Sequence, residues 1–111
     1  MSEESILQQN TVELFRRCGW LVFHPYKSFH SEPGFLDMVA VKRPVICFAE
    51  FKGSKGKLTK AKLNKHNRLM PGQEDWFNEL QGCPSVLSFV WKPDDWDEIV
   101  KIATHPIDKA I

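Results

Sequence analysis

The sequence has few cysteines and no long apolar run, and each of these absences excludes a class of protein. Its three cysteines, Cys18, Cys47 and Cys83, lie far apart and match no zinc-binding spacing, so we expect three small buried side chains in a reducing compartment. No apolar stretch is long enough to span a bilayer, and the acidic N-terminus lacks a signal-peptide core. The sequence therefore predicts a soluble, cytoplasmic protein that has no membrane partner.

Acidic residues are almost absent from the middle of the chain, although the net charge of the whole is only +1. Between Lys42 and Arg68 the single acid is Glu50. The same segment holds nine bases, which are Lys42, Arg43, Lys52, Lys55, Lys57, Lys60, Lys62, Lys65 and Arg68. This concentration of positive charge favours a local contact with a polyanion, and a solvated loop without a partner is the alternative.

The length of 111 residues, with 42% apolar and 26% charged residues, is typical of one globular domain. We assign 1–111 to that domain, with a lysine-rich insert at about 60–72. Periodicity predicts a helix over about 4–18, and Pro71 and Pro93 open two more. Apolar runs predict four strands, over residues 20–23, 35–41, 45–52 and 86–91. This order predicts an α/β fold with a small mixed sheet flanked by helices, in which the third and fourth strands are parallel.

The first predicted helix contains an acid whose orientation is ambiguous. Its apolar face is predicted to consist of Ile6, Leu7, Leu14, Phe15 and Cys18. Glu13 lies seven residues after Ile6, about 20° from it around the helix axis, and therefore at the edge of this face. Glu13 is either an exposed acid beside Arg16 and Arg17 or an acid that leans into a site.

Charged residues interrupt the two apolar strands in the centre of the chain. Asp37 lies within the first strand, and Glu50 and Lys52 end the second. Buried charges are costly unless they are paired or bound to a metal. Since side chains alternate along a strand, Glu50 and Lys52 share one face, about 6.6 Å apart.

The turn at Lys42-Arg43-Pro44 decides whether Asp37 joins that face. The connection is too short for a crossover helix, so the two strands form an antiparallel hairpin. A loop of two or four residues places Asp37 opposite Glu50. A loop of three places Asp37 opposite Ala49 unless a bulge intervenes. A metal site here therefore requires an even loop or a bulge.

Two carboxylates that converge from adjacent strands have the chemistry of a Mg²⁺ or Mn²⁺ site. These ions prefer oxygen ligands, activate water and offset charge on a phosphate oxygen. Lys52 would orient the nucleophile or stabilise the phosphate, and Gln73 would enter from the next helix. A structural salt-bridge cluster is the alternative. The cations expected to bind the DNA backbone are Lys55, Lys57, Lys60 and Lys62.

These motifs together resemble the PD-(D/E)XK nuclease superfamily, and within it the VRR-NUC family of small nucleases. The segments that carry the resemblance are Gly34-Phe35-Leu36-Asp37, Glu50-Phe51-Lys52-Gly53, Gly56-Lys57-Leu58-Thr59, and Gln73 with Trp76. It extends from the first helix to about Ala103. The resemblance implies a restriction-endonuclease-like α-β-β-β-α-β core.

The resemblance also implies roles for individual residues. The residues it marks as catalytic are Asp37, Glu50, Lys52, Gln73 and Glu13. Asp37 and Glu50 would bind the metal with the backbone carbonyl of Phe51, and Glu13 would match a first-helix acid of related junction-resolving enzymes. The chain departs from the pattern in two places: Leu36 stands where the superfamily has proline, and 60–72 separates Thr59 from Gln73.

The sequence therefore predicts a Mg²⁺- or Mn²⁺-dependent endodeoxyribonuclease acting on DNA, with flaps or four-way junctions as plausible substrates. Such enzymes often pair, so we expect a homodimer. A nucleic-acid-binding module that keeps the fold without cutting is the alternative. A subunit that acts only within a larger complex is a third interpretation.

Overall fold

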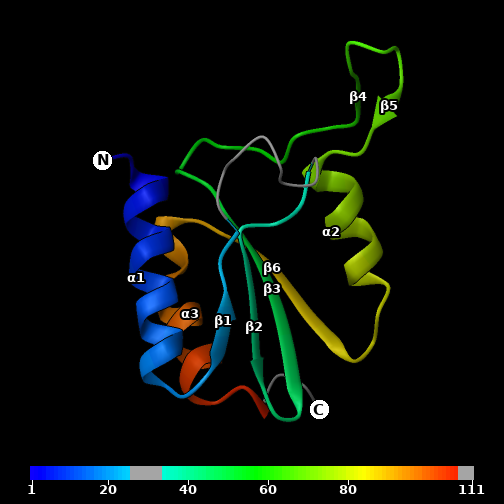
Figure 1. Cartoon of the computed structure of the whole chain (residues 1–111). Helices are drawn as coiled ribbons and strands as arrows, with labels where there is room; N and C mark the ends of the chain where they lie inside the picture. Colours follow the sequence, from blue (N-terminus) through cyan, green and yellow to red (C-terminus); the bar gives the residue numbers. More distant parts are fainter. Residues whose placement is uncertain (26–33, 108–111) are drawn as a thin grey trace.

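The structure is a computed structural model that describes residues 1–25 and 34–107 (Figure 1). It is a mixed α/β fold with a four-stranded sheet flanked by helices, as predicted. The helices are α1 (Glu3–Arg17), α2 (Gln73–Gln81) and α3 (Trp96–Thr104), the last preceded by a short 3₁₀ turn, η1 (Pro93–Asp95). The strands are β1 (Leu21–Phe23), β2 (Met38–Lys42), β3 (Val45–Phe51), β4 (Lys62–Leu63), β5 (Leu69–Met70) and β6 (Val86–Trp91).

The main sheet has the order β1-β2-β3-β6. Its first three strands are antiparallel neighbours, whereas β6 lies parallel to β3. The parallel pairing predicted from the intervening helix is thus confirmed, because α2 carries the chain back to the start of the sheet. Strands β4 and β5 form a separate two-stranded sheet outside this core.

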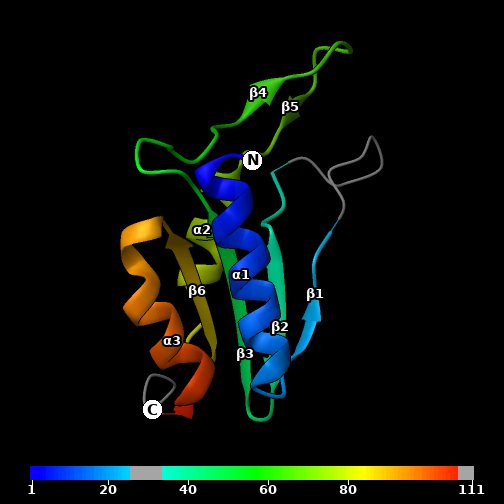
Figure 2. The same ribbon diagram turned by 90° about the vertical axis from the view of Figure 1, so that its left-hand side faces the viewer.

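The two faces of the sheet are covered differently. Alternate residues of β3, such as Cys47 and Phe51, are buried in a core shared with α1 and α3, which lie together on one face (Figure 2). Phe15 of α1 lies at the centre of that core, with its ring centroid 4.9 Å from Trp20. The opposite face carries Ile46, Phe48 and Glu50, and α2 covers it on the β6 side. The sheet therefore has one fully covered face and one partly covered face.

The hairpin between β2 and β3 has a loop of two residues. Lys42 pairs with Val45, so only Arg43 and Pro44 connect the strands. The ladder runs regularly from this turn to the pair Met38 and Ala49. The even loop required by the metal-site hypothesis is thus confirmed.

The buried face of α1 differs from the predicted one. Ser2 caps the helix by accepting a hydrogen bond from the Ser5 amide. The buried residues are Leu7, Gln8, Thr11, Val12 and Phe15. Of the predicted face, Leu7, Leu14, Phe15 and Cys18 do pack in or against the core, but Ile6 is exposed. Thr11 is accommodated in the core because its hydroxyl donates to the Leu7 carbonyl oxygen at 2.8 Å.

The three cysteines are free and differ in burial. Cys47 is buried, and burial raises the pKa of its thiol to about 12. Cys18 is half-buried, but Cys83 is exposed, so the prediction of burial is wrong for Cys83. This residue lies on the surface because it follows the end of α2. No helix within the described parts of the chain is long and apolar enough to cross a membrane.

Residues 60–72 leave the core and return to it at one narrow point. A Cβ atom on Gly72 would lie 2.5 Å from the Thr59 carbonyl oxygen and closer still to the carbonyl carbon of Lys60. The two ends of the insert therefore touch through their backbones, and only glycine fits at the contact.

Replacing Gly72 with alanine should therefore lower the free energy of unfolding by about 1–3 kcal/mol, since the new methyl group meets backbone atoms. Gly82→Ala is the matched control, because its Cβ would lie 3.4 Å from its nearest neighbour and its φ is negative. Urea unfolding of both variants measures the difference. Equal stabilities would show that the contact is not tight.

Candidate metal centre

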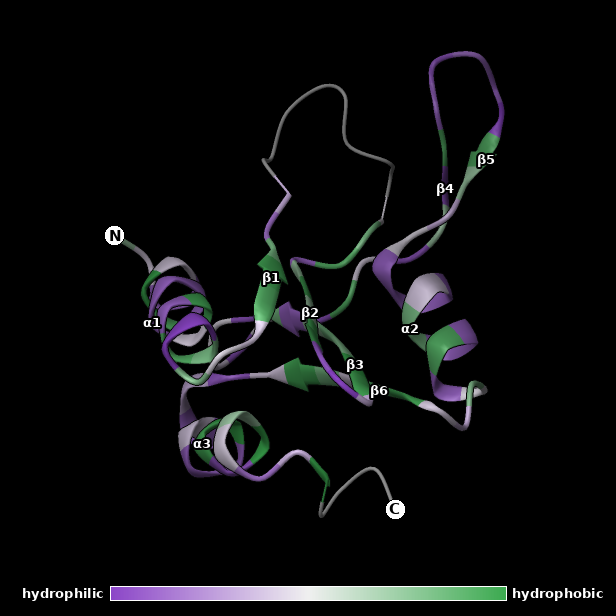
Figure 3. Cartoon of the chain, turned by 60° about the horizontal axis from the view of Figure 1, so that its bottom comes forward, coloured by the Kyte–Doolittle hydropathy of each residue, from purple (hydrophilic) through white to green (hydrophobic). Residues whose placement is uncertain are grey.

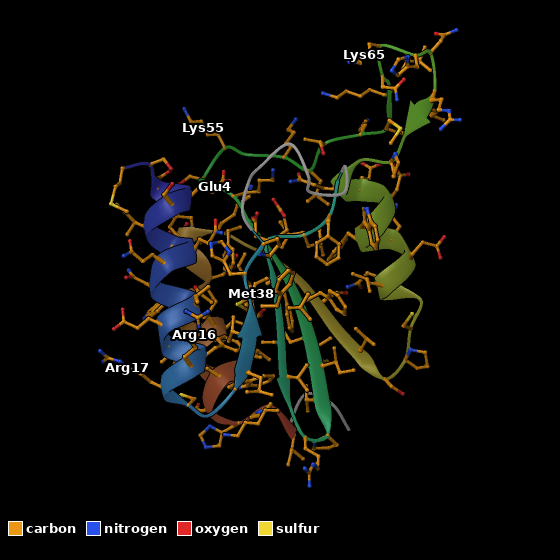
Figure 4. The ribbon with its side chains drawn as sticks, in the orientation of Figure 1. Glu4, Arg16, Arg17, Met38, Lys55 and Lys65 are labelled. Carbon is orange, nitrogen blue, oxygen red and sulfur yellow. The ribbon has the colours of Figure 1, made fainter. Side chains whose placement is uncertain are left out.

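Three carboxylates from distant parts of the chain meet at one end of the sheet. Glu4 comes from the first turn of α1, Asp37 immediately precedes β2, and Glu50 lies on β3. One oxygen from each lies within 4.8 Å of the other two. Figure 4 labels Glu4 near the start of α1. We call these three residues the acid cluster.

The register of the hairpin brings Asp37 and Glu50 together. The ladder ends with Met38 opposite Ala49, and one further step in the same register places Asp37 opposite Glu50. Asp37 also accepts a hydrogen bond from the Phe51 amide to Oδ2 at 3.0 Å. The bond fixes the Asp37 carboxylate at the edge of β3, beside Glu50.

Glu50 is the most buried member of the acid cluster, with 1% of its surface exposed. Its Oε2 accepts a hydrogen bond from Gln73 Nε2 at 2.7 Å and lies 3.4 Å from the Lys52 ammonium. Its Oε1 is buried and has no hydrogen-bond donor among the described residues. A buried oxygen without a donor is costly, and the cost is removed if a cation binds there.

The protonation of Glu50 reflects this environment. Burial, and after it the nearby charge of Asp37, raises the pKa of the Glu50 carboxyl from 4.5 to about 8, and Lys52 offsets part of the rise. A side-chain hydrogen bond between Glu50 and Asp37 contributes to this rise, so without a cation the protonated form of Glu50 is favoured. A cation bound among the acids would favour the ionised form.

The donor set fits a hard divalent cation. Mg²⁺ and Mn²⁺ prefer oxygen ligands, and all three members of the acid cluster offer carboxylate oxygens. Glu50 Oε1 is the oxygen most suited to bind such an ion, because it is buried and has no hydrogen-bond donor among the described residues. The described contact of Phe51 at this centre is made by its amide, which donates to Asp37. Ligation by the Phe51 carbonyl stays a prediction.

The structure brings Gln73 into the centre although the insert separates it from Thr59 in sequence. The Thr59 amide donates to Gln73 Oε1 at 3.1 Å, and the Gln73 amide donates to the Thr59 hydroxyl at 3.0 Å. The Thr59 carbonyl accepts from the Glu74 amide at 3.0 Å. Thr59 thus accepts hydrogen bonds from the first two backbone amides of α2. This helix end presents the side-chain amide of Gln73 to Glu50.

Glu13 lies outside the acid cluster. Its carboxylate is exposed and pairs with Arg17 at 2.6 Å on the helix surface, which is the exposed alternative left open above. The α1 acid that joins the cluster is Glu4, which sequence reasoning missed. Glu4 lies seven residues before the fully buried Thr11, so it points toward the core by the geometry first applied to Glu13 and Ile6.

A second polar contact missed from the sequence supports the backbone of Asp37. His24 Nδ1 lies 3.1 Å from the Asp37 carbonyl oxygen. The Gln8 amide nitrogen lies 2.9 Å from the same ring nitrogen and 3.1 Å from His24 Nε2. Gln8 is one of the polar residues on the buried face of α1, which is the signal that would have identified it. His24 and Gln8 thus brace the acid cluster between α1 and β2.

The predicted DNA-binding lysines lie at the end of the molecule that carries the acid cluster. Lys55 and Lys57 are on the loop after β3, and Lys60 and Lys62 lie at the start of the insert; all four are exposed. The loop is held near α1 because Glu3 Oε1 accepts a hydrogen bond from the Ser54 amide at 3.1 Å. Figure 4 places the labelled Lys55 close above Glu4.

Comparison of the chain with protein-family models and with curated proteins yields no match. Any assignment of function therefore rests on the residues of the site and their geometry.

The raised pKa of Glu50 predicts how the metal-free protein responds to pH. Between about pH 4.5 and pH 8 the folded chain keeps a proton that the unfolded chain has released, so stability should fall as pH rises through this window. In Glu50→Gln this part of the fall should disappear, since an amide does not titrate. Urea unfolding in EDTA at several pH values measures it.

Glu13→Gln is the matched control, because this acid is exposed and should leave the pH profile unchanged. Adding Mn²⁺ near pH 8 should stabilise the wild type more than Glu50→Gln. Parallel pH profiles for wild type and Glu50→Gln would refute the assignment of the buried proton to Glu50.

Proposed function

We propose that this chain is a metal-dependent endodeoxyribonuclease of the PD-(D/E)XK superfamily, similar to the VRR-NUC family. The observation that carries the proposal is Glu50 Oε1, a buried carboxyl oxygen without a donor among the described residues, placed among other acids and next to Lys52. A divalent cation bound among the acids would take this oxygen as a ligand and would favour the ionised form of Glu50.

Asp37 and Glu50 would hold Mg²⁺ or Mn²⁺, with Glu4 as a third acid on the α1 side. When bound, the ion supplies an activated water and offsets charge on the phosphate oxygens. The chain's own contribution is orientation: Gln73 holds Glu50 by one oxygen, and the Phe51 amide holds Asp37. Both carboxylates are thereby fixed before substrate arrives.

Lys52 would supply the positive charge that the reaction needs on the substrate side. Its side chain is largely buried, and its ammonium lies 3.4 Å from Glu50 Oε2, so it is held within the centre. An ammonium there can orient the attacking water or stabilise the phosphorane that forms. Because the same group also pairs with Glu50, its loss would affect the metal site as well.

The order of elements supports the superfamily assignment. The chain runs α1-β1-β2-β3-α2-β6, interrupted only by the insert that contains β4 and β5. This matches the α-β-β-β-α-β order expected of a restriction-endonuclease-like core, and the acids lie at the ends of β2 and β3 where that core would place them. The exposed lysines beside the acids favour DNA as the substrate.

Cleavage assays test the proposal. With Mg²⁺ or Mn²⁺ the purified protein should cut DNA, and Asp37→Ala, Glu50→Ala and Lys52→Ala should each lower the rate by roughly 100-fold or more. A panel of single-stranded, duplex, flap and four-way-junction substrates would identify the preferred structure.

Glu13→Ala is the matched control and should cut at the wild-type rate, since Glu13 lies outside the acid cluster. Undiminished cleavage by Glu50→Ala would reject the mechanism. A wild-type protein that binds DNA but never cuts it would instead favour the non-catalytic binding module.

The homodimer is also proposed, on the basis of the partly covered face of the sheet. Leu21, Val41 and Ile46 lie side by side across β1, β2 and β3, and all three are exposed. Phe23, two residues along β1, extends the same face, and 60% of its surface is accessible. A second copy of the chain would cover this apolar surface.

Light scattering tests the dimer. The double substitution Leu21→Glu and Phe23→Glu should convert a dimer to a monomer, because charges cannot be buried unpaired at an interface. Ile6→Glu places the same charge on an exposed apolar residue of α1 and should leave the mass unchanged. A wild-type protein that is already monomeric at high concentration would contradict the proposal.

A further inference from the structure

The insert is an arm that extends beyond the core. We define the arm as residues 60–72. Its strands β4 and β5 pair antiparallel, with Lys62 opposite Met70 and Leu63 opposite Leu69. Figures 1 and 2 both show the arm projecting past the end of the sheet at which α1 begins.

The base of the arm is attached directly to the candidate metal centre. Thr59 precedes the arm and Gln73 follows it, and their backbone and side-chain groups exchange two hydrogen bonds. Gln73 in turn donates to Glu50. The Gly72 amide, at the foot of the arm, donates to Asp75 Oδ2 at 2.8 Å. The position of the arm is therefore tied to the acids through a short series of bonds.

The tip of the arm is a defined turn. The Asn64 side-chain oxygen accepts hydrogen bonds from the amides of His66 and Arg68, at 2.8 and 3.0 Å. The Asn64 amide donates to the Arg68 carbonyl at 2.8 Å, and Asn67 adopts a left-handed φ of 63°. This is the three-residue hairpin loop with one left-handed residue that commonly connects antiparallel strands.

The surface of the arm combines two kinds of side chain. No acidic residue occurs between Phe51 and Gln73, and the arm carries four cations, which are Lys60, Lys62, Lys65 and Arg68. Leu63 and Leu69 face each other across the strands on one side, 59% and 70% exposed. Figure 3 shows the hydrophilic tip beside the hydrophobic β5, and Figure 4 places Lys65 at the tip.

The cations by themselves fit the phosphates of a nucleic acid, but the leucine pair does not. Phosphate contacts need no apolar surface. Apolar side chains do act on nucleic acids when they wedge against the faces of bases that are unstacked or unpaired. Cations that flank a leucine pair therefore match a DNA whose backbone is bound while some of its bases are exposed.

We propose that the arm recognises unpaired or unstacked bases in DNA, with Leu63 and Leu69 against the base faces and the arm's cations on the flanking phosphates. The inference rests on the proposed nuclease function and names the feature of the substrate that this centre selects. Since the arm is tied to Gln73, a discontinuity bound at the arm would lie at a set distance from the acids.

Equilibrium binding tests the arm, with Ca²⁺ in place of Mg²⁺ and a labelled duplex compared with the same duplex bearing a single-stranded flap. The double substitution Leu63→Ser and Leu69→Ser should lower the affinity for the flap roughly tenfold. The affinity for the duplex should stay within about twofold of the wild-type value. Substituting Lys62, Lys65 and Arg68 with glutamine should weaken binding to both, and reduce the slope of log K against log salt by about two to three.

Two controls keep these variants interpretable. Thermal unfolding should be unchanged in the leucine variant, because both side chains are already exposed. The second control is a shortened chain in which Lys60 is joined directly to Gly72, since the backbones of these two residues already touch. This shortened chain should lose the flap preference as the leucine variant does. A leucine variant that keeps the flap preference would overturn the proposal. So would leucine-dependent binding to phosphatidylserine vesicles without any effect on DNA.

The arm and the nuclease can fail separately. If the wild type never cuts DNA with Mg²⁺ or Mn²⁺ but its flap preference depends on the leucines, the nuclease proposal fails and the arm stands. If the wild type cuts DNA and the leucine variant cuts flap and duplex in the wild-type ratio, the arm proposal fails and the nuclease stands.

Discussion

The burial of the Glu50 carboxyl is the constraint on which the rest of this structure depends. A carboxyl group with 1% of its surface exposed is costly to ionise, and the neighbouring Asp37 makes it costlier still. The chain compensates one of its oxygens with Gln73 and Lys52 and leaves the other without a donor among the described residues. Protonation of Glu50 lowers this cost, and a divalent cation bound among the acids would instead favour the ionised carboxylate. The proposed function therefore begins from this one side chain.

The elements around Glu50 each contribute to its position. The two-residue turn sets the register that brings Asp37 opposite it, and the pairing of β3 with β6 holds its strand in the middle of the sheet. The N-terminus of α2 presents Gln73 because Thr59 satisfies the first amides of the helix. The arm begins and ends at this same junction. Substrate selection by the arm and chemistry at the acids would therefore be mechanically connected through residues that already touch.

Much of the site was predictable because its residues obey local rules. Side-chain alternation along a strand placed Glu50 and Lys52 on one face, and counting residues in the turn showed which loop lengths would bring in Asp37. The confirmed two-residue loop selects among those alternatives. The predicted face of the first helix was right for Leu7, Leu14, Phe15 and Cys18 but wrong for Ile6, because several apolar residues define more than one possible face. Including Ile6 in that face placed Glu13 at its edge, whereas the real face also includes Thr11, on the side where Glu4 lies.

The sequence by itself determined the order of the core elements without β4 and β5, the faces of the two central strands and the presence of an acid pair with its lysine. These follow from periodicity, which depends only on neighbours along the chain. The tertiary structure alone decided that Glu4 completes the acid cluster, that His24 and Gln8 brace Asp37, and that Gln73 reaches Glu50 past an insert. Those contacts join residues up to 46 positions apart, as between Glu4 and Glu50. Their formation depends on how helices and strands pack, and no local pattern encodes that packing.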